Sequence, residues 1–162
     1  MKKRTTLLLS MVCFMYSVLS LSLPVQATDT EYYSNIEMLT NGYYYETTIE
    51  DEETQIASKT RATTQYVTKT KTTKLKNNNG DVLWSVSIKA TFSYDGTTSK
   101  CTSCTPSAEA YASSWSVKSV TSSKSGNSAT ATAVATHTLI FGITQDTTKS
   151  VTIQCSATGV VS

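Results

Sequence analysis

The clearest alternation of hydrophobic and polar positions in the chain covers residues 84–94. The apolar residues all have one parity there, and Ser, Lys and Thr occupy the other. Because side chains alternate between the two faces of a β-strand, this pattern predicts an antiparallel strand with one buried and one solvated face. The apolar set is Trp84, Val86, Ile88, Ala90, Phe92 and Tyr94.

Turn residues divide the neighbouring sequence into further short strands. A Thr- and Lys-rich strand is expected over residues 63–76, and Asn77 to Asp81 should form a hairpin loop, since Asn and Gly readily adopt positive φ. Asp95 and Gly96 predict the next turn. A short strand should follow over residues 99–105 and stop at Pro106, which lacks a backbone N–H.

The C-terminal third continues the same pattern. Residues 108–120 should form one or two strands, residues 124–127 a turn, and residues 129–141 a long strand of Ala, Thr and Val. A turn over residues 142–148 should lead to a final strand around Val151, Ile153 and Cys155. Six to seven short strands with regular turns favour a sandwich or barrel, and we expect an antiparallel, immunoglobulin-like β-sandwich.

The first 27 residues are unlike the rest of the chain. A basic start is followed by an uncharged apolar run, then by Pro24 and by small residues at Val25 and Ala27. This order is typical of a secretory signal peptide cleaved after Ala27, and an uncleaved membrane anchor is the alternative. We therefore expect an extracellular protein with no stable membrane anchor.

Charge is unevenly distributed along the remaining chain. Residues 28–58 hold eight of the 12 acidic residues and no Lys or Arg, whereas residues 59–162 hold 11 of the 14 basic residues. We interpret residues 28–58 as a weakly structured, acidic, Tyr-rich arm and residues 59–162 as the sandwich domain. The chain without its first 27 residues is nearly neutral, so its charge gives no indication of nucleic-acid binding.

Three cysteines follow the predicted cleavage site, and two of them should pair in an oxidising compartment. Cys155 has the core parity of its strand. Cys101 and Cys104 have opposite parity in a regular strand, so only one of them faces inward. We prefer a Cys101–Cys155 disulfide because the spacing of Cys101, Trp115 and Cys155 is similar to that of an immunoglobulin constant-type domain. Cys104 would remain free for an intermolecular link and hence for an oligomer.

Two kinds of chemistry compete with this interpretation. Cys101, Cys104, Cys155 and His137 together have a valid zinc-ligand composition, but export favours oxidation of the thiols, so we expect no metal or other cofactor. His137 is also the one candidate base for a nucleophile, and no spacing in the sequence supports such a pair. We therefore expect a protein that is not an enzyme.

Lys69, Lys71, Lys74 and Lys76 form a basic stripe along one predicted strand. Such a stripe could contact an anionic cell-wall polymer or lipid headgroups. Its ordinary explanation is an edge strand protected by Lys against aggregation. A third possibility is that the acidic cluster of residues 50–53 lies on the stripe.

Four stretches of the chain form a recognisable set, at residues 68–71, 80–96, 100–101 and 151–157. Together they resemble small Ser/Thr-rich secreted proteins of Gram-positive bacteria that are grouped as a domain of unknown function. The resemblance covers about residues 61–159, implies export, and supports the Cys101–Cys155 pairing. It implies no catalytic or binding residue.

Two functions follow from these expectations. The first is a secreted, non-enzymatic β-sandwich module that acts by surface contact with a cell-wall polymer, a host surface or another copy of itself. The second is a secreted precursor of a bacteriocin-like or toxin-like protein, in which the acidic residues 28–58 are a pro-segment that masks the basic domain.

Overall fold

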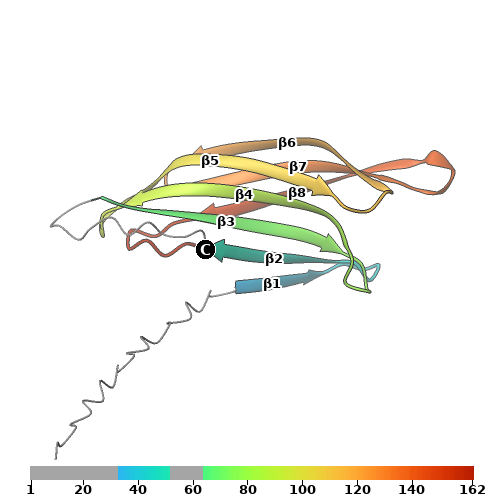
Figure 1. The fold of residues 1–162 in the computed structure, drawn as a ribbon, viewed down its shortest axis with the longest axis horizontal. Helices are drawn as coiled ribbons and strands as arrows, with labels where there is room; N and C mark the ends of the chain where they lie inside the picture. The colour runs from blue at the N-terminus through green and yellow to red at the C-terminus, as the bar shows by residue number, and fades with distance from the viewer. Residues whose placement is uncertain (1–32, 52–63) are drawn as a thin grey trace, which may run out of the picture.

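The structure is a computed structural model that describes residues 33–51 and 64–162, and these residues form an all-β sandwich of two antiparallel sheets (Figure 1). Within each sheet, the strands lie side by side in the order in which they follow one another in the sequence. The five-stranded sheet contains β1 (Tyr33–Met38), β2 (Tyr44–Asp51), β3 (Gln65–Lys76), β4 (Val82–Tyr94) and β5 (Ser99–Ala110). The three-stranded sheet contains β6 (Trp115–Ser125), β7 (Ser128–Thr138) and β8 (Thr144–Gln154).

The predicted β-sandwich is confirmed, but its connections differ from those of an immunoglobulin domain. Residues 64–162 supply six strands, from β3 to β8. Each sheet is a simple meander, whereas immunoglobulin sheets exchange strands through Greek-key connections. The spacing of Cys101, Trp115 and Cys155 therefore did not indicate the immunoglobulin strand order.

The core lies between β4 and β7. The alternation over residues 84–94 holds in the structure, where Trp84, Val86, Ile88, Ala90 and Phe92 are at most 1% exposed. Facing them is a stripe of small side chains on β7, also at most 1% exposed, formed by Ala129, Ala131, Ala133 and Ala135. Small residues opposite large ones let the two sheets interdigitate at the density of a protein interior.

Strand β5 continues past Pro106 to Ala110, so the expected end at residue 105 is wrong. Pro106 lies opposite Ile88 on β4. Because β5 is the edge of the five-stranded sheet, it has one side without a strand partner. A proline that turns its nitrogen toward that side removes no hydrogen bond from the sheet.

The expected strand over residues 129–141 is three residues too long. Strand β7 ends at Thr138, and Ile140–Gly142 form a single 3₁₀ turn before β8 begins at Thr144. The turn is closed by the Leu139 N–H, which donates to the Ile143 carbonyl at 2.6 Å. The observed turn therefore lies closer to the N-terminus than the predicted turn over residues 142–148. Its apolar residues form the end of the hairpin between β7 and β8.

The acidic segment is part of the sheet, so the expectation of a weakly structured arm is wrong for residues 33–51. Strand β2 pairs with β3 along its whole length, from Tyr44 opposite Lys76 to Asp51 opposite Lys69. Tyr45 and Ile49 of β2 are 6% and 7% exposed. The predicted signal peptide, residues 28–32 of the arm and residues 52–58 lie outside the described residues.

The smaller sheet covers only part of the larger one (Figure 1). Strands β5 and β6 lie side by side and close the sandwich at one edge, while β8 packs against β3 and β4. Strands β1 and β2 extend beyond β8, so the opposite edge is open. Within residues 33–51 and 64–162, no helix is long and apolar enough to span a membrane.

Candidate functional site: a lysine-lined cleft at the open edge

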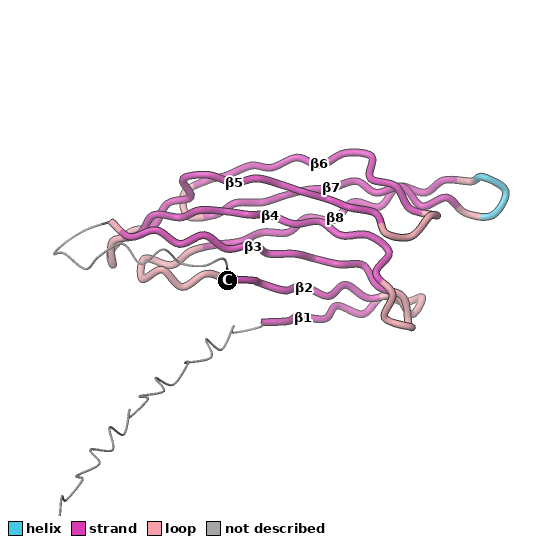
Figure 2. The backbone as a smooth tube through the Cα atoms, viewed as in Figure 1, coloured by secondary structure: helices cyan, strands magenta, loops and turns pink. Residues whose placement is uncertain are grey.

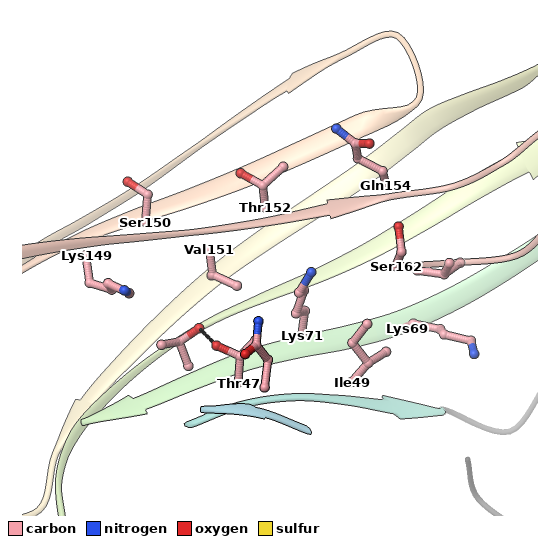
Figure 3. A pocket seen from close by; sticks show the side chains of 13 residues that line it. Thr47, Ile49, Lys69, Lys71, Lys149, Ser150, Val151, Thr152, Gln154 and Ser162 are labelled. Carbon is pink, nitrogen blue, oxygen red and sulfur yellow. Dashed lines mark hydrogen bonds between the residues drawn. The ribbon is translucent and has the colours of Figure 1, made fainter. Parts of the chain in front are cut away.

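A cleft of about 790 Å³ runs along this open edge (Figure 3). One wall is the inner face of β2 and β3, and the other is β8 with the C-terminal residues (Figure 3). Most of its lining residues are Ser, Thr, Asn, Gln and Lys. They are Asn35, Thr47, Ile49, Lys69, Lys71, Thr73, Lys149, Ser150, Val151, Thr152, Gln154, Val161 and Ser162.

The predicted basic stripe is divided between two faces of the sheet. Lys69 and Lys71 lie opposite Ala90 and Ile88, which belong to the buried face of β4, so both point toward the cleft. Lys74 lies opposite Ser85 and points to the outer face, as does Lys76. The four lysines therefore cannot contact one ligand together, and the sequence missed Lys149, which joins Lys69 and Lys71 from β8.

Acidic residues of β1 and β2 neutralise most of the lysines. Lys69 pairs with Asp51 at 2.5 Å, and Lys149 pairs with Glu37 at 2.7 Å. On the outer face, Lys76 pairs with Glu46 at 2.5 Å. The third possibility for the stripe, contact with the acidic cluster at residues 50–53, thus holds for Asp51, which reaches Lys69 as part of a regular strand pair.

Lys149 is also fixed by an aromatic ring. Its ammonium lies 3.9 Å from the centroid of the Tyr45 ring, a cation–π distance. Tyr45 is buried, and this burial, followed by the nearby Glu37 carboxylate, raises the pKa of its hydroxyl. Lys149 therefore has a defined position on the cleft wall.

Lys71 differs from the other lysines of the cleft. Its neighbours across the sheet are Ile49 and Ile88, and burial lowers the pKa of its ammonium. Within the described part of the chain, the Lys71 ammonium takes part in no ion pair and no hydrogen bond. An ammonium carries three hydrogen-bond donors, so Lys71 presents unsatisfied donors and a positive charge to the cleft.

Strand β8 adds backbone groups to the same cleft. Gln154 and Ser162 exchange two backbone hydrogen bonds of 2.9 Å, so the N–H and C=O of Gln154 point away from β7. Alternate residues of an antiparallel strand point their backbone groups to the same side. Ser150 and Thr152 therefore direct theirs along the open edge, beside the lysines.

Cys101 and Cys104 lie on β5, at the other edge of the larger sheet, and Cys155 directly follows β8 of the smaller sheet. The structure has Cys101, Cys104 and Cys155 as free thiols, so the expected Cys101–Cys155 disulfide is not formed in it. The Cys101 and Cys155 thiols each donate to a backbone carbonyl at 3.3 Å, of Ser103 and Ser156 respectively. Burial is the main cause that raises the pKa of both thiols.

A β-bulge alters the predicted orientation of Cys104. Phe92 lies opposite Cys101, but Thr91 lies opposite Ser103, so Thr102 is an extra residue in β5. Cys104 then pairs with Ala90 and has the same inward parity as Cys101. The expectation that only one of the two cysteines faces inward assumed a regular strand and is wrong.

The alternative zinc set is not brought together. His137 stacks on Trp115 with ring centroids 4.5 Å apart, and Trp115 in turn stacks on Trp84 at 6.1 Å. The Cys104 thiol lies 3.7 Å from the Ser122 hydroxyl. Residues 33–51 and 64–162 contain no cluster of three or more His, Cys, Asp or Glu side chains that could hold a metal ion.

Comparison of the chain with protein-family models, with characterised proteins and with solved structures finds no match.

Proposed function

We propose that this protein is an extracellular binding module that holds a segment of an anionic polymer, such as a phosphate-bearing cell-wall polymer, in the lysine-lined cleft. The observation that carries the proposal is the half-buried Lys71, whose charge has no partner in the described part of the chain. A buried charge without a partner is costly, and a ligand anion would supply the missing partner.

The surroundings of Lys71 suit a phosphate ligand that binds without reacting. Ser150 and Thr152 offer outward backbone N–H groups, which donate to anionic oxygens, while their side-chain hydroxyls bond to Thr132 and Thr130 on the outer face of the smaller sheet. The cleft extends along the strands and is open, as an extended polymer requires. Among the described residues that line it, there is no His, Cys, Asp or Glu, the residue types that most often act as an acid, base or nucleophile.

The position of the acidic segment favours this proposal over the precursor alternative. Removal of residues 28–58 would take β1 and β2 out of the five-stranded sheet and would remove one wall of the cleft. A pro-segment that masks an otherwise complete domain would be expected to pack on its surface.

The proposal is tested by sedimentation of the purified protein with isolated Gram-positive cell walls and by its binding to polyphosphate. We expect binding at low salt that weakens as salt is raised. Lys71→Met should weaken binding roughly tenfold or more, because a hydrogen-bonded contact between charged groups is lost from a partly desolvated site.

Lys74→Met is the matched control, since Lys74 lies on the same strand but points to the outer face. It should bind as the unaltered protein does. Equal losses in the two variants would show diffuse attraction rather than a site, and full recovery of the unaltered protein in the supernatant at low salt would refute polymer binding.

A further inference from the structure

The hairpin between β7 and β8 ends in an exposed apolar tip, which consists of residues 139–143. Leu139 is 40% exposed, Ile140 78%, Phe141 96% and Ile143 62%. The tip projects past the other loops at its end of the sandwich and lies at the end of the molecule opposite the C-terminal turn (Figures 1 and 2). Single exposed apolar residues are common, but a contiguous exposed group usually marks an interaction site.

The tip is a closed turn that holds its side chains outward. The Leu139 N–H donates to the Ile143 carbonyl at 2.6 Å, and the Gly142 N–H donates to the Leu139 carbonyl at 3.2 Å. Phe141 has a φ of 64°, a left-handed conformation that is unfavourable for an aromatic residue. A strained backbone that persists at an exposed site is a motive to look for function there.

Polar residues surround the base of the tip, and charge begins further down the hairpin. Thr138 and Thr144 face each other directly below the tip, followed by His137 opposite Gln145. The first charged group is Asp146, which accepts hydrogen bonds from Lys118 at 2.6 Å and from Thr136 at 2.7 Å. Along the hairpin axis, an apolar apex is thus followed by a hydroxyl collar and then by an ion pair.

We propose that this tip inserts into the surface of a lipid bilayer. The order of apex, collar and ion pair matches the change from acyl chains to headgroups to water, and lipids can close around a narrow convex group. A stable contact with a folded protein needs about 800 Å² from each partner, which the end of one hairpin does not offer. The two hydrogen bonds inside the turn lower the cost of placing its backbone away from water.

Such an anchor is weak and reversible. Binding strength in the interface scales with the apolar area that is buried, and four side chains give much less than a spanning segment. The attraction does not depend on charge, so it should persist at high salt. This behaviour separates it from anion binding in the cleft, and the two proposals can fail independently.

The test is flotation of the chain that begins at Thr28 with neutral phosphatidylcholine vesicles at about 0.5 M NaCl, where electrostatic attraction is screened. We expect a bound fraction that rises with lipid concentration. Phe141→Asn should reduce the partition coefficient about tenfold, because the most exposed apolar side chain is removed. Asn tolerates the left-handed conformation better than Phe does, so this variant should fold at least as well.

Val160→Asn is the control, because Val160 is 68% exposed beyond the far end of β8. It should float with the vesicles as the unaltered protein does. Absence of the unaltered protein from the vesicle fraction, or equal flotation of Phe141→Asn, would overturn the proposal. A dimer that Phe141→Asn dissociates in analytical ultracentrifugation, without any vesicle binding, would assign the tip to contact between copies instead.

Discussion

Burial separates the three thiols of the domain into two reactivity classes. Cys101 and Cys155 are 3% and 1% exposed, and desolvation raises the pKa of both. For Cys101, the nearby Cys104 raises the pKa further, while Lys124 opposes the rise. Because the thiolate is the reactive form, both buried thiols should react slowly. Cys104 is half-buried on the edge strand β5, where reagents have better access.

Iodoacetamide should therefore modify one cysteine of the native chain that begins at Thr28, and Cys104→Ser should abolish this modification. Intact mass reports the number of labels. After unfolding without reductant, the free thiols of the structure predict three labels. A single label in the unfolded protein would instead establish one disulfide, and an unlabelled Cys104→Ser variant under the same conditions would assign it to Cys101 and Cys155. Rapid native labelling of Cys101 would contradict its burial.

At the scale of strands, the sequence predicts regular elements well and irregular ones poorly. The alternation from Trp84 to Phe92 identifies β4 and its buried face, because a pleated strand repeats every two residues. The bulge at Thr102 leaves no such signal, yet it changes the direction of Cys104. The continuation of β5 through Pro106 also depends on its edge position, which is a property of the sheet.

The Ala stripe of β7 shows how closely the two sheets fit. Ala133 is 0% exposed and faces the large side chains of the other sheet, so a bigger side chain has no free space. Ala133→Leu should lower the free energy of unfolding by about 1–3 kcal/mol through overpacking. Urea denaturation followed by tryptophan fluorescence measures the change.

Thr121→Leu provides the comparison, because Thr121 is exposed on β6 and lies opposite Thr132 on the outer face. Its effect on stability should stay within about 0.5 kcal/mol. An Ala133→Leu variant as stable as the unaltered protein would mean that the sheets can move apart without cost.

At the scale of the whole molecule, the cleft exists because five strands pack against three. Its two walls come from strands β1, β2 and β3 and from residues 149–162, which are distant in the sequence. The sequence identified Lys69 and Lys71 as candidates, but not Lys149 or the edge of β8, because long-range packing decides which residues meet. It also assigned the acidic residues to an arm, since charge alone does not show that β2 pairs with a Lys-rich strand.

This arrangement makes β2 necessary for the stability of the domain. A chain that begins at Thr64 lacks β1 and β2, which exposes the edge of β3 and removes the ion pairs of Lys69 and Lys76. The buried Tyr45 and Ile49 are lost as well, each contributing about 1.5–3 kcal/mol. We therefore expect this chain to unfold at least about 3 kcal/mol more easily than the chain that begins at Thr28, or to aggregate through the exposed β3 edge.

A chain that begins at Asn41 is the matched control, because it lacks β1 alone, the mostly exposed edge strand. It should keep a cooperative urea transition with a smaller loss of stability, since β2 still covers the edge of β3.

The precursor alternative makes the opposite prediction for the chain that begins at Thr64. If the protein that begins at Thr64 unfolded at the same urea concentration and gained activity against bacterial cells or membranes, the acidic segment would be a pro-segment. The cleft, which needs β2 as a wall, would then not be the functional site.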